Sequence, residues 1–262
     1  MFRTSFREGP SNTIMPTRHA DDPLAQLLWL GHEIGREDRG LALPGEGSVS
    51  VRLGEGRFGV RCSGTALHEL TKADICQCDS KEIISFIDSQ GSDTSDLQAA
   101  LIKTVPTGAP RPTTESLFHA WLLQLEGVHF VGHCHPEACL QILCSPVADR
   151  FADHRMFPDE ILNCGPQSTL VPYLEPGAQL ARELRAKVNI YIRRNFGRPP
   201  RLILLQNHGI IALGETAKGV LNTLLMAEKA ARIFVGAAQL GGPNFMTPAM
   251  VTRIDNPGRT RR

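Results

Sequence analysis

Helical and strand periodicities alternate along the second half of the chain, and this alternation limits the fold more than any other feature. Stretches with apolar residues at helical spacing are separated by short apolar runs that are typical of strands. The expected elements are a helix over 114–125, a strand over 128–135, a helix opened by Pro136, a helix over 176–196, strands over 202–206 and 210–213, and a helix over 215–240. Helices interleaved with strands pack against a sheet, so the pattern predicts a mixed α/β layer fold.

The first half contributes a helix and a β-hairpin. Asp22 can cap a helix that Pro23 opens, and apolar residues recur at helical spacing as far as Ile34. The other expected elements are strands over 48–53 and 57–62 joined by the turn 54–56, a strand over 75–79 and a polar loop over 91–112. The hairpin therefore follows the first helix directly.

Composition sets the domain limits and narrows the partners. A chain of 262 residues with 42% hydrophobic and 21% charged residues is typical of one globular domain, and it lacks the roughly 18 continuous apolar residues of a membrane span. We expect a disordered leader over 1–21, one domain over 22–240, and a Gly/Pro-rich basic tail over 241–262 without regular structure. A net charge of +1 argues against nucleic acid or anionic membranes as principal partners.

The cysteines predict the compartment. Seven cysteines without a CxxC pair argue against a disulfide framework and against a four-cysteine zinc module. The first twenty residues also lack the apolar segment of a secretory signal. We therefore expect free thiols and a cytoplasmic location.

Two histidines end the apolar strand expected over 128–135. Alternate strand residues point to the same face, so the imidazoles of His133 and His135 project to one side while Cys134 points into the core. Two such imidazoles form half of a metal site, but alone they are more often polar residues at a strand end. Further ligands are needed.

His208 is the candidate third ligand. It follows the apolar run 202–206 and precedes Gly209, which permits a close backbone approach or a positive φ. Three neutral nitrogen ligands with an open position are typical of a catalytic zinc site. A lone histidine here would be an ordinary turn residue, whereas its pairing with His133 and His135 favours a metal.

Pro112, Thr113, Thr114 and Glu115 lie where the helix over 114–125 begins. Hydroxyl groups and free amides at a helix start suit an anion such as phosphate. The plainer interpretation is a capping segment with Glu115 favourably placed in the helix dipole. Beside a metal-held substrate, Glu115 would instead be a general acid/base, helped by a pKa that dehydration raises.

Two glycine-containing turns bracket the hairpin. Residues 45–48 precede its first strand, and Ser63 and Gly64 follow its second. Such segments are usually only turns, but their backbone amides could bind a phosphate.

Taken in order, these segments resemble the class II aldolase/adducin family. The segments that carry the resemblance are Gly47–Arg52 (family pattern G-N-V-S-x-R), Ser63–Gly64 (Thr/Ser-Gly), Pro112–Glu115 (P-S-S-E), His133–Pro136 (H-x-H-P) and Asn207–Gly209 (N-H-G). The similarity extends over about residues 23–240. Five ordered segments are specific, where any one of them would not be.

The resemblance implies a fold, a metal site and an assembly. The implied fold is a three-layer α/β/α unit around a mainly antiparallel sheet, commonly built into a homotetramer. Zinc, or another divalent metal such as Mn²⁺ or Co²⁺, would bind His133, His135 and His208, while Glu115 would act as the acid/base. The residues that would line the phosphate or equivalent polar end of the substrate are Ser48, Ser63, Gly64, Thr113 and Thr114.

The implied reaction is aldol cleavage or condensation of a small ketose phosphate. Zinc would stabilise an enediolate as a Lewis acid, and Glu115 would move the proton at its carbon. The chain departs from the family where Ser48 replaces an asparagine and where two threonines, 113 and 114, replace serines. Leu162 stands where some aldolases carry a proton-donating tyrosine, so that donor is unidentified.

Three hypotheses follow from these residues. A metal-dependent aldolase-type lyase of carbohydrate metabolism is favoured. The same scaffold acting as a sugar-phosphate epimerase, dehydratase or decarboxylase ranks second, because these reactions share the same chemistry. A non-catalytic adducin-like module ranks third, because members of that type lack the histidines present here. In each case we expect a homo-oligomer.

Overall fold

The computed structural model describes residues 22–89, 101–105 and 111–256, and its strands form one seven-stranded sheet. The strands, in sheet order, are β3 (Ile75–Asp79), β2 (Arg57–Arg61), β1 (Ser48–Gly54), β4 (Phe130–Cys134), β7 (Gly209–Gly214), β6 (Leu202–Leu205) and β5 (Thr169–Val171). All neighbours are antiparallel except β5 and β6, which are parallel. The mainly antiparallel sheet confirms the expected fold class.

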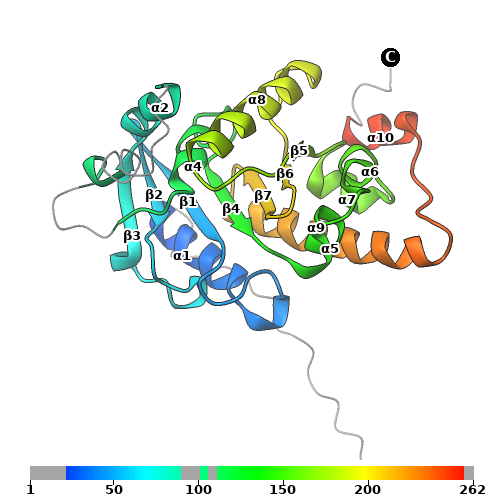
Figure 1. Cartoon of the computed structure of the whole chain (residues 1–262), viewed down its shortest axis with the longest axis horizontal. Coiled ribbons are helices and arrows are strands. Elements are labelled where there is room, and N and C mark those ends of the chain that lie inside the picture. The colour runs from blue at the N-terminus through cyan, green and yellow to red at the C-terminus, as the bar shows by residue number, and fades with distance from the viewer. Residues whose placement is uncertain (1–21, 90–100, 106–110, 257–262) are drawn as a thin grey trace, which may run out of the picture.

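Helices cover both faces of this sheet (Figure 1). The helices are α1 (Pro23–Ile34), α2 (Ser80–Asp88), α4 (Ser116–Leu122), α5 (Glu137–Leu143), α6 (Ala148–Asp153), α7 (Pro158–Cys164), α8 (Ala178–Arg194), α9 (Ala217–Gln239) and α10 (Pro248–Asp255), with short 3₁₀ turns at Glu37–Arg39, Leu67–Glu69 and Lys72–Asp74. Leu30 and Leu224 belong to the core beneath α1, α5 and α9, whereas Leu117 and Ile211 belong to the core beneath α2, α4 and α8. The result is a three-layer α/β/α arrangement.

The expected first helix and hairpin are confirmed. The Asp22 side chain accepts a hydrogen bond from Leu24 N at 2.9 Å, and Pro23 occupies the first helical turn. β1 and β2 pair across the turn 54–56. The strands expected over 128–135, 202–206 and 210–213 correspond to β4, β6 and β7.

Short elements differ most from expectation. Helices α6 and α7 and strand β5 occupy residues 148–171, where no element was expected, because each is too short to display a clear period. The tail expected to lack regular structure contains α10, which Thr247 caps and which packs on α7. The leader expected over 1–21 lies outside the described residues. In the part of the chain that the structure describes, no helix has the length and apolarity needed to cross a membrane.

Cys62 directly follows β2 and forms a disulfide with Cys76, the second residue of β3. Their Cα atoms are 5.6 Å apart, within the range that a disulfide requires. The expectation of free thiols is wrong for this pair, because a cysteine count does not reveal that β2 and β3 are neighbours. Cys134 is a free, fully buried thiol, as its strand phase predicts.

The centre of the sheet brings distant sequence segments to one edge. His133 in β4 pairs with Ile211 in β7, so the end of β4 meets the beginning of β7. Gly132 permits the close packing of α9 on this pair, since a Cβ there would lie 2.8 Å from Val220 Cγ1. Residues that follow β4 and precede β7 are therefore neighbours.

Candidate metal centre

Four side chains converge where β4 ends and β7 begins. One ligand atom from each of Glu115, His133, His135 and His208 lies within 4.8 Å of the others. The Nε2 atoms of His133 and His135 are 3.0 Å apart, and Glu115 Oε1 lies 3.4 Å from His133 Nε2. The ring centroid of His208 lies 5.0 Å from that of His133. The structure thus brings together the residues proposed from sequence, while their roles stay predictions.

The imidazole rings are oriented by contacts on their outer nitrogens. His133 Nδ1 donates a hydrogen bond to Ile210 O at 2.9 Å, which directs its Nε2 atom at the cluster. His135 Nδ1 lies 3.7 Å from Glu46 Oε1, so its Nε2 also faces the cluster. Outer contacts of this kind are typical of metal-binding histidines.

Gly209 allows the strands to close around the cluster. A Cβ on Gly209 would lie 2.5 Å from His135 Cδ2 and 2.6 Å from Cys134 O. Its φ is not in the left-handed region, so close approach is the reason for this glycine. The left-handed backbone occurs instead at Asn207, with a φ of 54°.

The charges of the cluster are tightly linked. Burial raises the pKa of Glu115, but the charge of His133 and hydrogen bonds from His133 and Ser48 outweigh it and hold that pKa below its ordinary value. The expectation of a raised pKa is wrong because neighbouring donors overcome dehydration. Burial, assisted by the charges of His133 and His135, lowers the pKa of His208 to about 4. His208 is therefore neutral near neutral pH, as a metal ligand must be.

A buried chain of hydroxyl and imidazole groups lies behind Glu115. His119 on α4 contacts Ser48 Oγ through Nε2 and Ser50 Oγ through Nδ1, each at 2.7 Å. Burial lowers the pKa of His119 to about 3, so the neutral ring donates one hydrogen bond and accepts the other. Ser48 is fully buried and also bonds Glu115, so this chain orients the carboxylate. Sequence reasoning misses Ser50, because its contact depends on the packing of α4 against β1.

The segments predicted to hold an anionic group lie side by side. Ser63 N donates to Arg111 O at 2.9 Å, which places the Ser63–Gly64 turn beside the threonine segment. Ser63 and Gly64 are exposed, whereas Thr113 and Thr114 are half-buried. Thr113 Oγ1 is buried and has no hydrogen-bond partner among the described residues.

A cavity of about 760 Å³ opens beside His135. Glu46 lines it together with apolar side chains of Leu43, Pro44 and Leu140. Carboxylates and apolar groups make this side of the cluster unfavourable for a phosphate and suitable for an uncharged group.

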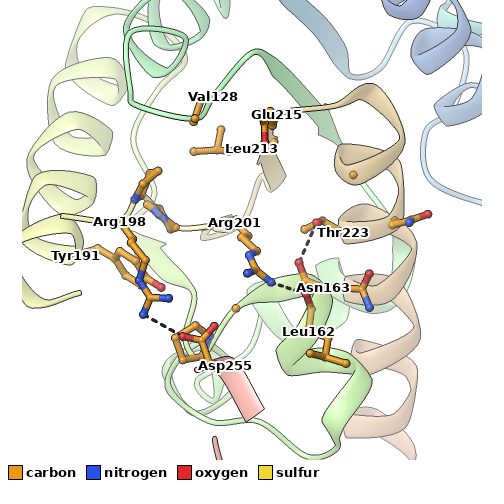
Figure 2. A pocket seen from close by; sticks show the side chains of 18 of the residues that line it. Val128, Leu162, Asn163, Tyr191, Arg198, Arg201, Leu213, Glu215, Thr223 and Asp255 are labelled. Carbon is orange, nitrogen blue, oxygen red and sulfur yellow. Dashed lines mark hydrogen bonds and ion pairs between the residues drawn. The ribbon is translucent and has the colours of Figure 1, made fainter. Parts of the chain in front are cut away.

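A second cavity, of about 700 Å³, lies at the far end of the same strands, where β4 begins and β7 ends (Figure 2). Arg198 pairs there with Asp255 at 3.0 Å, and Arg201 donates to the carbonyl of Leu162. Leu162 is 54% exposed and lines this cavity, far from the histidine cluster. It therefore has no contact with the predicted metal ligands.

The donor set of the cluster fits a divalent metal ion. Imidazole nitrogens and a carboxylate oxygen are the ligands that zinc and related metals bind in catalytic sites. Three imidazoles face one point and can bind a metal ion in their neutral form. The carboxylate of Glu115 lies beside them and can move a proton.

Comparisons with known proteins agree with this geometry. The family model described as the class II aldolase and adducin N-terminal domain matches residues 26–235. A 3-oxo-tetronate 4-phosphate decarboxylase of Haemophilus influenzae is 24% identical over 232 residues, which cover 87% of this chain and 95% of that protein. An uncharacterized oxidoreductase of Bacillus subtilis is 29% identical over 111 residues, 42% of this chain but 13% of the length of that protein. The solved structure of an L-fuculose 1-phosphate aldolase has a TM-score of 0.68 at 16% identity, covering 92% of this chain and 97% of that one.

Proposed function

The chain belongs to the class II aldolase and adducin N-terminal domain family, and from this premise we propose that it is a metal-dependent lyase that cleaves a small ketose phosphate by an aldol reaction. The convergence of Glu115 with three histidines is the observation that carries the proposal. An adducin-like module without chemistry would have no use for four such side chains facing one point. We also propose that residues 22–240 form the functional domain and act as a homo-oligomer.

We propose that His133, His135 and His208 hold the metal, with zinc as the expected ion. One ring nitrogen of each histidine faces the cluster, with the carboxylate of Glu115 beside them, and these are donor types that zinc prefers. When bound, the ion would supply Lewis-acid stabilisation of negative charge on a carbonyl oxygen.

Glu115 would move the proton. The contacts that hold its pKa low keep the carboxylate ionised, so it begins as a base. In cleavage the ionised carboxylate would first take the proton of the hydroxyl group on the carbon that leaves as the aldehyde, and would then donate it to the carbon next to the carbonyl. In condensation it would take the proton from that carbon and return it to the new hydroxyl group. Ser48, braced by His119, would keep the carboxylate oriented during both transfers.

The substrate would lie across the cluster with its two ends in different surroundings. The Ser63–Gly64 turn and the hydroxyls of Thr113 and Thr114 would receive the phosphate or an equivalent anionic end. The cavity beside His135 would receive the uncharged end, because carboxylates line it. This orientation favours a substrate with one anionic end.

Decarboxylation of a sugar-acid phosphate is the second candidate function. Its support is the Haemophilus influenzae relative, whose name describes such a decarboxylase and which matches most of both chains. Both reactions leave negative charge next to a carbonyl, so the same cluster would serve either. Epimerisation and dehydration use the same groups, but no contact among the described residues favours them.

A substrate panel distinguishes these functions. Zinc-loaded protein is incubated with ketose phosphates, the matching free sugars and oxo-acid phosphates, and the products are scored for aldehyde and for carbon dioxide. Aldehyde release from a ketose phosphate is the expected result. Release of carbon dioxide without aldehyde would contradict the aldol reaction and support decarboxylation. The absence of any product would contradict both reactions.

Glu115→Gln tests the proton transfer. We expect it to retain zinc and to lower turnover by on the order of a hundredfold, as the loss of a general acid/base does. Glu126→Gln is the matched control, because Glu126 is an exposed glutamate at the far cavity. Equal turnover in the two variants would remove Glu115 from the mechanism.

A further inference from the structure

The segment formed by Gly45, Glu46 and Gly47 lies against both histidines at the end of β4. Gly47 has a φ of 71°, and a Cβ there would lie 2.6 Å from His133 O. A side chain is thus excluded at Gly47, and the segment packs directly on the backbone of one predicted ligand. One residue earlier, Glu46 Oε1 lies 3.7 Å from the Nδ1 atom of His135, the second predicted ligand.

The Glu46 carboxylate is held in place for this contact. Its Oε2 atom accepts a hydrogen bond from Leu43 N at 2.9 Å, which leaves Oε1 directed at His135. A carboxylate at Nδ1 favours the tautomer with its proton on that nitrogen, so the Nε2 lone pair faces the cluster. That Nε2 atom is 3.0 Å from His133 Nε2, so both nitrogens could bind the same metal ion.

Arg61 braces the segment from the other side. Its side chain is only 5% exposed, and it donates to Gly45 O at 3.1 Å, to Glu46 O at 3.4 Å and to Thr65 O at 2.8 Å. One guanidinium therefore ties the segment before β1 to the turn after β2. Because the carbonyls face Arg61, the backbone that carries the Glu46 side chain is fixed relative to the sheet.

We propose that Glu46 is a positioning residue for the metal ligand His135, and that Arg61 holds the segment that presents it. The inference rests on the metal-dependent function proposed above and adds residues to which the family resemblance assigns no role. A cation on Nε2 makes Nδ1–H a stronger donor, so the contact with Glu46 would strengthen when the metal binds. Loss of such an outer partner typically lowers metal affinity by about 10- to 100-fold.

Zinc affinity of the full chain tests this role without any substrate. The dissociation constant for Zn²⁺ is measured by competition with a chromogenic chelator for the wild type, Glu46→Gln and Glu137→Gln. Glu137 is the matched control, because it is an exposed carboxylate lining the same cavity. We expect Glu46→Gln to bind zinc about 10- to 100-fold more weakly and Glu137→Gln to differ by less than about threefold.

Thermal unfolding of the metal-free variants separates positioning from folding. We expect Glu46→Gln and the wild type to melt together without metal, since Glu46 is partly exposed. Arg61→Lys keeps the charge but cannot reproduce the three carbonyl contacts, so it should weaken zinc binding. The loss should be smaller than in Glu46→Gln, because Arg61 acts on His135 only through the segment that carries Glu46. A lower metal-free melting temperature for Glu46→Gln would indicate a structural role and overturn the inference.

Other outcomes are equally decisive. Wild-type zinc affinity in Glu46→Gln would overturn the positioning role, and so would an equal loss in Glu137→Gln, which would indicate a general effect of charge. A wild-type chain that binds zinc but releases no product from any substrate contradicts the proposed reaction and leaves this inference intact. A wild-type chain without zinc affinity overturns both.

Discussion

The two ends of the β4–β7 pair have cavities of similar size, about 760 and about 700 Å³, but opposite ways of satisfying their polar groups. At the far end, Arg198 pairs with Asp255, and the Thr223 hydroxyl donates to Asn163 O at 3.0 Å (Figure 2). At the near end, ligand atoms from three histidines and one glutamate face one another within 4.8 Å.

Cavity volume alone therefore does not distinguish the two ends of this sheet. A paired arginine or threonine has already found its partner within the chain, so it offers little to a ligand. Imidazoles gathered at one point repel one another when protonated, and a metal ion replaces that repulsion by coordination. Convergent donors, rather than empty space, are therefore the reason to propose the chemistry at the near end.

The sharpest test of the comparison uses the two glycines that bound β7. We expect Gly209→Ala to lower zinc affinity by at least about 100-fold, because a methyl group would displace the His135 ring from a site that tolerates little misplacement. Gly214→Ala, at the far end, should bind zinc normally, since its Cβ would meet Val220 Cγ2 at the less severe distance of 3.1 Å. Metal content and chelator competition measure both. Normal zinc binding by Gly209→Ala would contradict the proposed ligand geometry.

A smaller, continuous effect is expected from pH. Burial lowers the pKa of His133, but the charge of Glu115 and its hydrogen bond raise it more, so the net shift is upward. Zinc binds the neutral imidazole, so affinity should be full above this raised pKa and fall by about tenfold per pH unit below it. Chelator competition between about pH 5.5 and about pH 8.5 measures the decline.

Glu115→Gln supplies the control for this pH dependence. Without the carboxylate, the pKa of His133 loses the two largest of the interactions that raise it, so the decline in zinc affinity should begin at a lower pH. A decline at the same pH in wild type and variant would show that a group other than His133 competes with zinc.

The smallest effect should come from the far end. Thr223→Val removes the partly buried hydrogen bond to Asn163 O, so we expect a loss of about 1 kcal/mol in the free energy of unfolding and unchanged zinc affinity. Urea denaturation of the metal-free protein measures the first quantity. A change in zinc affinity would show that the two ends are coupled, against the comparison drawn above.

Local periodicity predicts the parts of the site that one strand determines. The alternation of β4 places His133 and His135 on one face and Cys134 in the core, and all three positions agree with the structure. The position of His208 follows from the apolar run before it. These residues need no knowledge of the neighbouring strands.

Tertiary packing decides the rest, and no local pattern contains it. In the sequence, Glu46 belongs to a turn and Arg61 to a strand end, and neither position indicates a role. Their roles depend on the sheet, which brings together the turns on both sides of the hairpin. Ser50 becomes relevant only through α4, and the low pKa of Glu115 depends on donors from other elements. Leu162 shows the same limit, because its sequence position does not indicate at which end of the sheet it lies.

The division of the cluster among β4, β7 and the start of α4 has a consequence for folding kinetics. Of the three proposed zinc ligands, His133 and His135 are close together even in an unfolded chain, whereas His208 joins them after β4 and β7 have paired. An ion that binds the native state far better than the unfolded chain stabilises by mass action. Because its full ligand set forms late, zinc should slow unfolding much more than it speeds folding. The ion would then stabilise the completed sheet against unfolding and would not nucleate its folding.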